Sequence, residues 1–289
     1  MKKYLLFLLT VFFISCSKDE PAPVPPVEEP TLVTKLIVVD TTKTAPNDTL
    51  AMTTYEYDAL KRITKQTLYL YNPASQTYAY RYNFDYGYNG TETLASTMFE
   101  NYPTPSVNIR WKHFFSHNAA GQLVADSSHD VTVGASTDSM VYTKIYTYTA
   151  SEYQETRNDY YPVAGTTTYA AIKFQRDAGN NIVSLGDASV RSFFAYDNKI
   201  NPLTKSFPVN APYLNSVDFP CVYTNLMEQY SNFYKIFTNT YDGSGTVLSS
   251  VLTREFITIY GANNLPQTTR IRNYPATTTD KNKYIFLYQ

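Results

Sequence analysis

The chain has 289 residues, of which 43% are hydrophobic, 16% aromatic and 17% charged, and its formal net charge is −1. If an N-terminal segment that contains Lys2 and Lys3 is cleaved off, two positive charges are lost and the formal net charge becomes −3. This balance lacks the basic face that nucleic acids require, so we predict no nucleic-acid partner.

The first expected element is a secretory signal. Two lysines precede an apolar run over residues 4–14, which is shorter than the roughly 20 residues of a membrane-spanning helix. The end of the run, Phe13-Ile14-Ser15-Cys16, resembles the bacterial lipobox, in which cleavage leaves a lipid-bearing cysteine as the first residue. We predict a signal peptide over residues 1–15 and lipidation of Cys16. An ordinary signal peptide with an accidental cysteine is the alternative.

A short charged segment and a proline-rich linker are expected next. Residues Ser17, Lys18, Asp19 and Glu20 resemble the acidic export signal that follows the lipidated cysteine in Bacteroidetes surface lipoproteins. That resemblance implies a protein anchored in the outer membrane and facing the extracellular side, whereas a charged linker start is the alternative. Proline fixes φ and removes hydrogen-bond donors. Residues 16–31 are therefore predicted to form a lipid-bearing, semi-rigid linker.

The remaining residues, 32–289, are predicted to form a single all-β domain. The clearest strand covers residues 77–88, where every second residue is aromatic. These residues are Tyr78, Tyr80, Tyr82, Phe84, Tyr86 and Tyr88. Strict period two predicts one aromatic and one polar face. We favour the aromatic face as the inside of a curled sheet over a binding platform for sugar rings.

A hairpin unit recurs along this domain. An aromatic-x-aromatic strand end is followed by Asp or Asn, a few turn residues, and an aliphatic residue that starts the next strand. Asp, Asn and Gly suit such turns because they tolerate left-handed φ and cap their own backbone. Examples are Tyr55-Glu56-Tyr57-Asp58, Phe174 to Asn180, Tyr196 to Pro202 and Tyr241-Asp242-Gly243. The unit predicts a large curled antiparallel meander, an open or partly closed barrel-like sheet.

On these motifs the chain resembles the Tyr-Asp hairpin repeats of Rhs-like proteins. It also resembles Bacteroidetes surface lipoprotein domains of unknown function that have a porin-like curled antiparallel β-sheet. The resemblance covers about residues 32–289 and implies the topology of a curled antiparallel sheet. It implies no catalytic residues in this chain. Four prolines interrupt the pattern between residues 201 and 232, where we expect a long excursion across the rim or into the concavity.

Candidate chemistry is sparse. His113 and His117 point the same way on a strand but lie about 13 Å apart, too far for one metal ion. The run Ser127-Ser128-His129-Asp130 holds the residue types of a hydrolytic triad, but a triad needs convergence from separate segments. The remaining cysteine, Cys221, is expected to be a small buried hydrophobe. We predict no catalytic residue, no metal and no cofactor.

Three triplets match the Asp-Ser/Thr-aliphatic type of pattern at which exported Bacteroidetes proteins receive O-glycans. They place the modified residues at Thr41, Thr49 and Ser139. The triplet is short, and chance is the alternative explanation.

Three functions compete. The leading hypothesis is a non-enzymatic outer-membrane lipoprotein, a binding or accessory module for a glycan or protein partner. The second is an extracytoplasmic hydrolase with its active site on rim loops such as residues 201–232. The third is a membrane-embedded β-barrel, suggested by period-two strands and the C-terminal sequence Tyr284-Ile-Phe286-Leu-Tyr288-Gln289. The polar face of residues 77–88, with Arg81 and Asp85, opposes the third hypothesis.

Overall fold

The structure of the protein is a computed structural model. It describes residues 32–45, 48–103, 108–132, 139–148, 152–161, 165–168, 172–176, 182–187, 189–200, 231–261, 263–274 and 282–289. The predicted signal peptide and linker lie outside these ranges. The predicted excursion does too, except for residues 231 and 232, which begin a strand.

The described residues form 17 strands that belong to one antiparallel sheet. The strands are β1 (Val33–Asp40), β2 (Thr49–Tyr57), β3 (Ile63–Asn72), β4 (Thr77–Tyr88), β5 (Ala95–Pro103), β6 (Asn108–His117), β7 (Leu123–Asp130), β8 (Ser139–Tyr148), β9 (Glu152–Tyr161), β10 (Gly165–Thr168), β11 (Ile172–Arg176), β12 (Ile182–Gly186), β13 (Val190–Ile200), β14 (Ser231–Tyr241), β15 (Val247–Tyr260), β16 (Pro266–Asn273) and β17 (Asn282–Tyr288).

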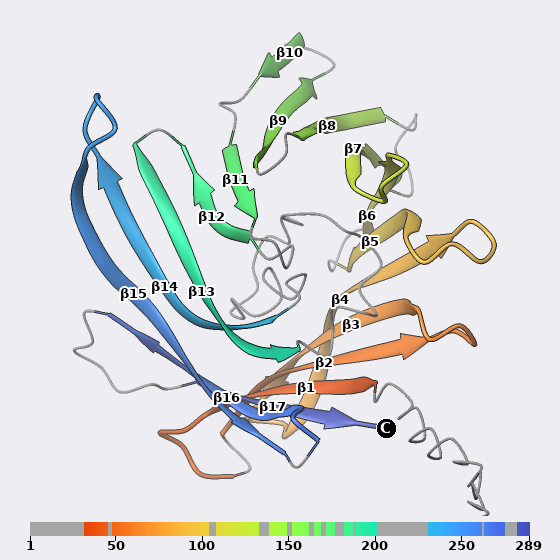
Figure 1. Ribbon diagram of the computed structural model, residues 1–289. Helices are drawn as coiled ribbons and strands as arrows, with labels where there is room; N and C mark the ends of the chain where they lie inside the picture. The colour runs from red at the N-terminus through yellow and green to blue at the C-terminus, as the bar shows by residue number, and fades with distance from the viewer. Residues whose placement is uncertain are drawn as a thin grey trace, which may run out of the picture. The chain divides into compact units, whose positions relative to one another are not determined.

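The sheet is a meander in which neighbours in sequence pair with one another. Strand β9 pairs with β8 on one side and with both β10 and β11 on the other. The last strand, β17, pairs with β1 over seven residue pairs, so the two ends of the sheet meet (Figure 1). Around β9 to β13 the ladders shrink to three or four residue pairs, which leaves that side only partly closed. The predicted all-β antiparallel meander is confirmed.

The core lies on one face of the sheet, which we call the inner face. A row of cross-strand partners shows it well, because paired residues project from the same face. This row consists of Phe286, Leu36, Thr53, Leu68 and Tyr82, each 4% exposed or less. Burying apolar surface at about 25 cal/mol per Å² makes this face the main source of stability.

Strand β4 does not present a single aromatic face. Leu68 of β3 pairs with Tyr82, but the next residue, Tyr69, pairs with Tyr80, so Arg81 is an extra residue in β4. Such a bulge exchanges the faces on its two sides. The inward-facing residues are Tyr82, Phe84 and Tyr86, and the outward-facing residues are Tyr78 and Tyr80. The predicted continuous aromatic face is therefore wrong for the first half of the strand.

Four strands end on a tyrosine that is hydrogen-bonded in the same way. Its hydroxyl donates to the backbone carbonyl of the first residue of the preceding strand. The pairs are Tyr57 with Val33, Tyr88 with Ile63, Tyr148 with Leu123, and Tyr288 with Pro266. The first, second and fourth bonds measure 2.8, 2.6 and 2.6 Å. We call this contact the tyrosine lock. It fixes one end of each of these strand pairs.

Four turns also share one geometry. They begin at Asp58, Asn118, Asp242 and Gly261, and the first residue donates to the carbonyl of the fifth while the fourth donates back to the first. The fourth residue has positive φ in every case, 62° at Lys61, 74° at Gly121, 85° at Gly245 and 58° at Asn264. In the three turns that begin with Asp or Asn, the side-chain oxygen also accepts two backbone N–H groups. The turn residues therefore terminate the strands as expected from their chemistry.

Candidate functional site

Four ionisable side chains are buried together on the inner face of β5 to β8. They are Glu100, His113, Asp126 and Lys144, each 6% exposed or less, and we call them the buried ionic cluster. His113 Nδ1 lies 2.8 Å from Asp126 Oδ1, and His113 Nε2 lies 3.2 Å from Glu100 Oε1. The imidazole is therefore placed between two carboxylates.

Strand register brings this cluster together. His113 pairs with Ser128, and Asp126 pairs with Lys144 on the next strand, so all four project from the face that holds the core. Asp126 Oδ2 and the Ser128 hydroxyl have no hydrogen-bond partner among the described residues. No local pattern in the sequence predicts the contacts of His113 with Asp126 and Glu100, because these contacts depend on how three strands align.

The electrostatics of His113 favour its charged form. Burial alone lowers the pKa of an imidazole, but Asp126 and Glu100 outweigh it and raise the pKa of His113 to about 9. At neutral pH a protonated His113 therefore offsets the negative charge of its carboxylate neighbours. His113 is only 1% exposed, so its charge is buried on the inner face of the sheet. A ligand at the protein surface therefore does not contact the cluster.

The run Ser127-Ser128-His129-Asp130 lies on β7, where successive residues alternate between faces. Ser128 is fully buried on the inner face, whereas His129 lies on the outer face with its ring 5.2 Å from that of Phe114. The structure therefore does not bring these residues together as a triad.

His113 and His117 both belong to β6, as the sequence predicted, and His117 is its last residue. Within the described ranges, no group of three or more His, Cys, Asp or Glu side chains is arranged to hold a metal ion. In the same part of the chain, no helix has the length and apolar character needed to cross a membrane.

The predicted modification sites fall in different places. Thr41 is exposed in the turn after β1, Thr49 is the half-buried first residue of β2, and Ser139 is the first residue of β8. The lipidation and export residues lie outside the described ranges. They are Cys16, Ser17, Lys18, Asp19 and Glu20.

An aromatic cluster stands on the outer face near the turn between β3 and β4. It consists of Tyr69, Tyr71, Tyr78 and Tyr80, and we call it the aromatic platform. The rings of Tyr69 and Tyr80 lie 6.2 Å apart, and those of Tyr71 and Tyr78 lie 5.3 Å apart. Tyr78 and Tyr80 are 40% and 42% exposed. The bulge at Arg81 creates this platform, because without it both rings would join the core.

A polar network continues from the platform along the same face. The Tyr80 hydroxyl donates to Asn83 Oδ1, and partial burial together with Asp85 raises the pKa of Tyr80. Asp85 Oδ2 accepts from Asn83 Nδ2 at 2.7 Å and from Asn101 Nδ2 at 2.8 Å. Arg110 Nε donates to Asn101 Oδ1 at 2.9 Å. These bonds hold Tyr80 in one orientation.

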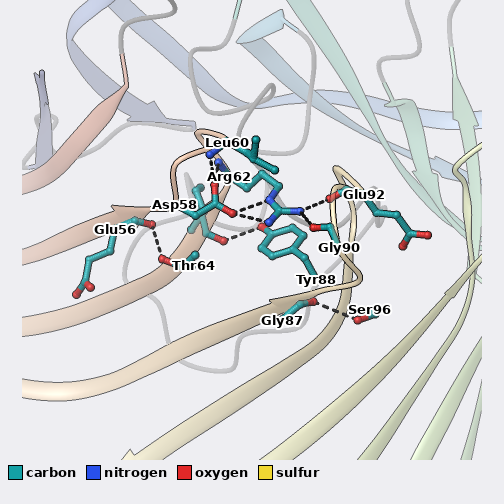
Figure 2. Close-up of polar contacts among 11 residues, drawn as sticks. Glu56, Asp58, Leu60, Arg62, Thr64, Gly87, Tyr88, Gly90, Glu92 and Ser96 are labelled. Atoms are coloured by element: carbon teal, nitrogen blue, oxygen red, sulfur yellow. Dashed lines mark hydrogen bonds and ion pairs between the residues drawn. The ribbon is translucent and has the colours of Figure 1, made fainter.

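A second arrangement orders the loops at the opposite end of these strands. Arg62 contacts Asp58 through Nε at 2.7 Å and Nη2 at 2.6 Å, and its guanidinium lies 4.2 Å from the centre of the Tyr88 ring. Its Nη1 donates to the backbone carbonyls of Gly90 at 2.8 Å and Glu92 at 2.6 Å (Figure 2). Arg62 thus ties the turn after β2 to the loop after β4.

Comparisons with known proteins find structural likeness at low sequence identity. Two solved structures with similar folds are porin-like proteins from Bacteroides uniformis and Bacteroides vulgatus. The first has 9% sequence identity, a TM-score of 0.42, and coverage of 89% of this chain and 98% of its own. The second has 12% identity, a TM-score of 0.43, and coverage of 90% and 99%. No protein-family model and no curated protein matches the chain. At these TM-scores the likeness carries no argument about function.

The buried ionic cluster predicts a loss of stability at alkaline pH. The folded-state pKa of about 9 lies above the ordinary value of 6.5, so the stabilisation is complete below pH 6.5 and disappears as the pH rises through about 9. The loss is on the order of 3 kcal/mol in the free energy of unfolding. Denaturant unfolding across this range measures it, together with an NMR titration of His113 whose midpoint we expect near 9.

The matched variants are His113→Gln and His129→Gln. We expect His113→Gln to flatten the pH dependence and His129→Gln, on the outer face, to keep it. An unchanged pH profile in a folded His113→Gln protein, or a His113 titration midpoint below 6.5, would contradict this account.

Proposed function

We propose that this protein is a surface-exposed outer-membrane lipoprotein that acts as a non-enzymatic binding module for a glycan. The single observation that carries the proposal is the aromatic platform, where Tyr78 and Tyr80 are turned out of the core by the bulge at Arg81. The sequence features that support anchoring and display are the lipobox ending at Cys16 and the proline-rich linker over residues 16–31.

The chemistry of the platform suits sugar rings. A tyrosine offers an apolar ring face with a hydroxyl at its edge and loses little conformational entropy on binding. Two pairs of such rings lie side by side on neighbouring strands, so their spacing is fixed by the sheet. A ligand with alternating apolar faces and hydroxyl groups matches this surface.

The polar network supplies the hydrogen-bonding half of such a site. The Asp85 side chain is 43% exposed and the Lys65 side chain 39%, and Lys65 Nζ lies 3.7 Å from Asp85 Oδ1. The amides of the buried Asn83 and the half-buried Asn101 both donate to the other oxygen of Asp85. A carboxylate fixed in this way is preorganised, which lowers the cost of binding a hydroxyl group.

Both alternative functions receive less support. A hydrolase needs acid and base groups that a substrate can reach, and in the part of the chain that the structure describes the pair His113 and Asp126 is almost fully buried. A membrane-embedded barrel needs an apolar outer band, because Arg or Lys facing lipid costs about 2–4 kcal/mol at the bilayer midplane. The outer face instead carries Lys65, Asp85 and Arg110.

The platform predicts a defined set of binding variants. We expect Tyr78→Ala and Tyr80→Ala each to weaken glycan binding by about three- to tenfold, since one stacking contact contributes about 0.5–1.5 kcal/mol. Tyr78→Phe keeps the ring and is expected to bind nearly as the native protein does. A glycan array identifies the ligand, and titration calorimetry with the mature protein measures the affinities.

Ile259→Ala is the control, because Ile259 is 60% exposed on β15 and is not part of the platform. Absence of any glycan binding, capture of only a protein partner, or full binding by a folded protein with both tyrosines replaced by alanine would refute the platform as a glycan site.

The proposed anchor has its own test. Several acyl chains hold a protein on a membrane stably, whereas one chain binds only marginally. We expect the Cys16→Ser protein to be found in the soluble fraction and not in the membrane fraction. We also expect that protease added to intact cells no longer digests it, because it is no longer held at the cell surface. Retention of the Cys16→Ser protein in the membrane fraction would show that the anchor lies elsewhere.

A further inference from the structure

The β5–β6 hairpin lacks the tyrosine lock. Strand β6 ends on His117 in place of the tyrosine that ends β2, β4, β8 and β17. By the same rule its partner position is Ala95, the first residue of β5. The imidazole is shorter than a phenol, and His117 Nε2 is buried without a hydrogen-bond partner among the described residues.

The partner position is also smaller than its counterparts. The first residue of the preceding strand is apolar and larger than alanine in the four locked hairpins, namely Val33, Ile63, Leu123 and Pro266. Ala95 is fully buried like them but lacks their volume. In the β5–β6 hairpin, the side chains at both positions, His117 and Ala95, are therefore smaller than their counterparts in the locked hairpins.

A cavity of about 430 Å³ lies where these side chains are reduced. Ala95, Phe115 and His117 line it on the strands, and Asn89, Glu92 and Asn118 line it in the loops after β4 and β6. The volume falls within the roughly 300–1,000 Å³ of small-molecule sites. We call it the rim cavity.

The loops that form its walls are held in place. Arg62 fixes the loop after β4 through the carbonyls of Gly90 and Glu92, and Figure 2 shows the Glu92 side chain extending away from the guanidinium. In the turn after β6, Asn118 accepts the N–H groups of Ala120 at 3.0 Å and Gln122 at 2.9 Å. The cavity is therefore preformed, which favours binding.

The lining combines one aromatic ring with polar groups of low charge. Burial lowers the pKa of His117, and the nearby Glu92 opposes this only in part, so the imidazole is neutral at neutral pH and can accept or donate a hydrogen bond. Phe115 adds an aromatic side chain to the lining, and Glu92 and Asn89 add a carboxylate and an amide. Such a lining fits a small ring that has hydroxyl groups and no net charge.

We infer that the rim cavity binds a single neutral sugar residue, at a site separate from the aromatic platform. The ligand takes the volume that a lock tyrosine and a larger aliphatic side chain occupy in the other hairpins, with His117 Nε2 as its buried polar partner. This site does not rest on the proposed platform function, because it lies at the other end of the strands.

The test uses the mature protein and a panel of free glucose, galactose, mannose and N-acetylglucosamine. We expect saturable binding of at least one sugar in the millimolar range or tighter, with shifts in the NMR resonances of the His117 ring. His117→Tyr restores the lock and fills the cavity, so we expect a higher melting temperature and at least tenfold weaker binding. Ile259→Ala, at an exposed position outside both the rim cavity and the aromatic platform, is expected to leave this binding unchanged.

Ala95→Leu fills the cavity from the opposite side and copies Leu123, so it serves if His117→Tyr does not fold. Three results overturn the inference: no sugar binds the native protein, sugar binds without shifting the His117 resonances, or a folded cavity-filling variant binds as tightly as the native protein. Loss of platform binding alone affects the proposed function and leaves the rim cavity intact.

Discussion

The hydrogen bond from a strand-end tyrosine to the first carbonyl of the preceding strand is the constraint on which the rest of this structure depends. In a long antiparallel meander, a shift of one residue in register turns every core side chain to the solvent. The tyrosine lock opposes such a shift, because the hydroxyls of Tyr57 and Tyr148 donate to particular carbonyls, those of Val33 and Leu123. At the same end of the strands, the turns that begin at Asp58 and Asn118 connect β2 to β3 and β6 to β7.

Both candidate binding features arise where the chain departs from this regular pattern. The bulge at Arg81 releases Tyr78 and Tyr80 from the core and places them beside Tyr69 and Tyr71. The replacement of a lock tyrosine by His117, opposite Ala95, opens the rim cavity. The surrounding hairpins are rigid, so they keep the exposed tyrosines and the walls of the cavity in fixed positions. A fixed geometry favours ligand binding.

The sequence predicted the all-β meander and the placement of His113 and His117 on one strand, since both follow from local period and turn chemistry. It did not predict the reversal at Arg81, because nothing in the alternating run of β4 marks where an extra residue enters. It offered no partner for His113, whereas the structure places the imidazole beside Asp126 on a separate strand. Contacts across strands require a register that local patterns do not contain.

The most direct test of the central claim is the free energy of unfolding of Tyr57→Phe and Tyr148→Phe, measured against Tyr78→Phe. Each lock variant loses one hydrogen bond and keeps its ring, so the account predicts a loss of about 1 kcal/mol in each. The exposed Tyr78 is not a lock residue, and its replacement is predicted to change stability by much less. Equal stabilities for all three variants would contradict the tyrosine lock.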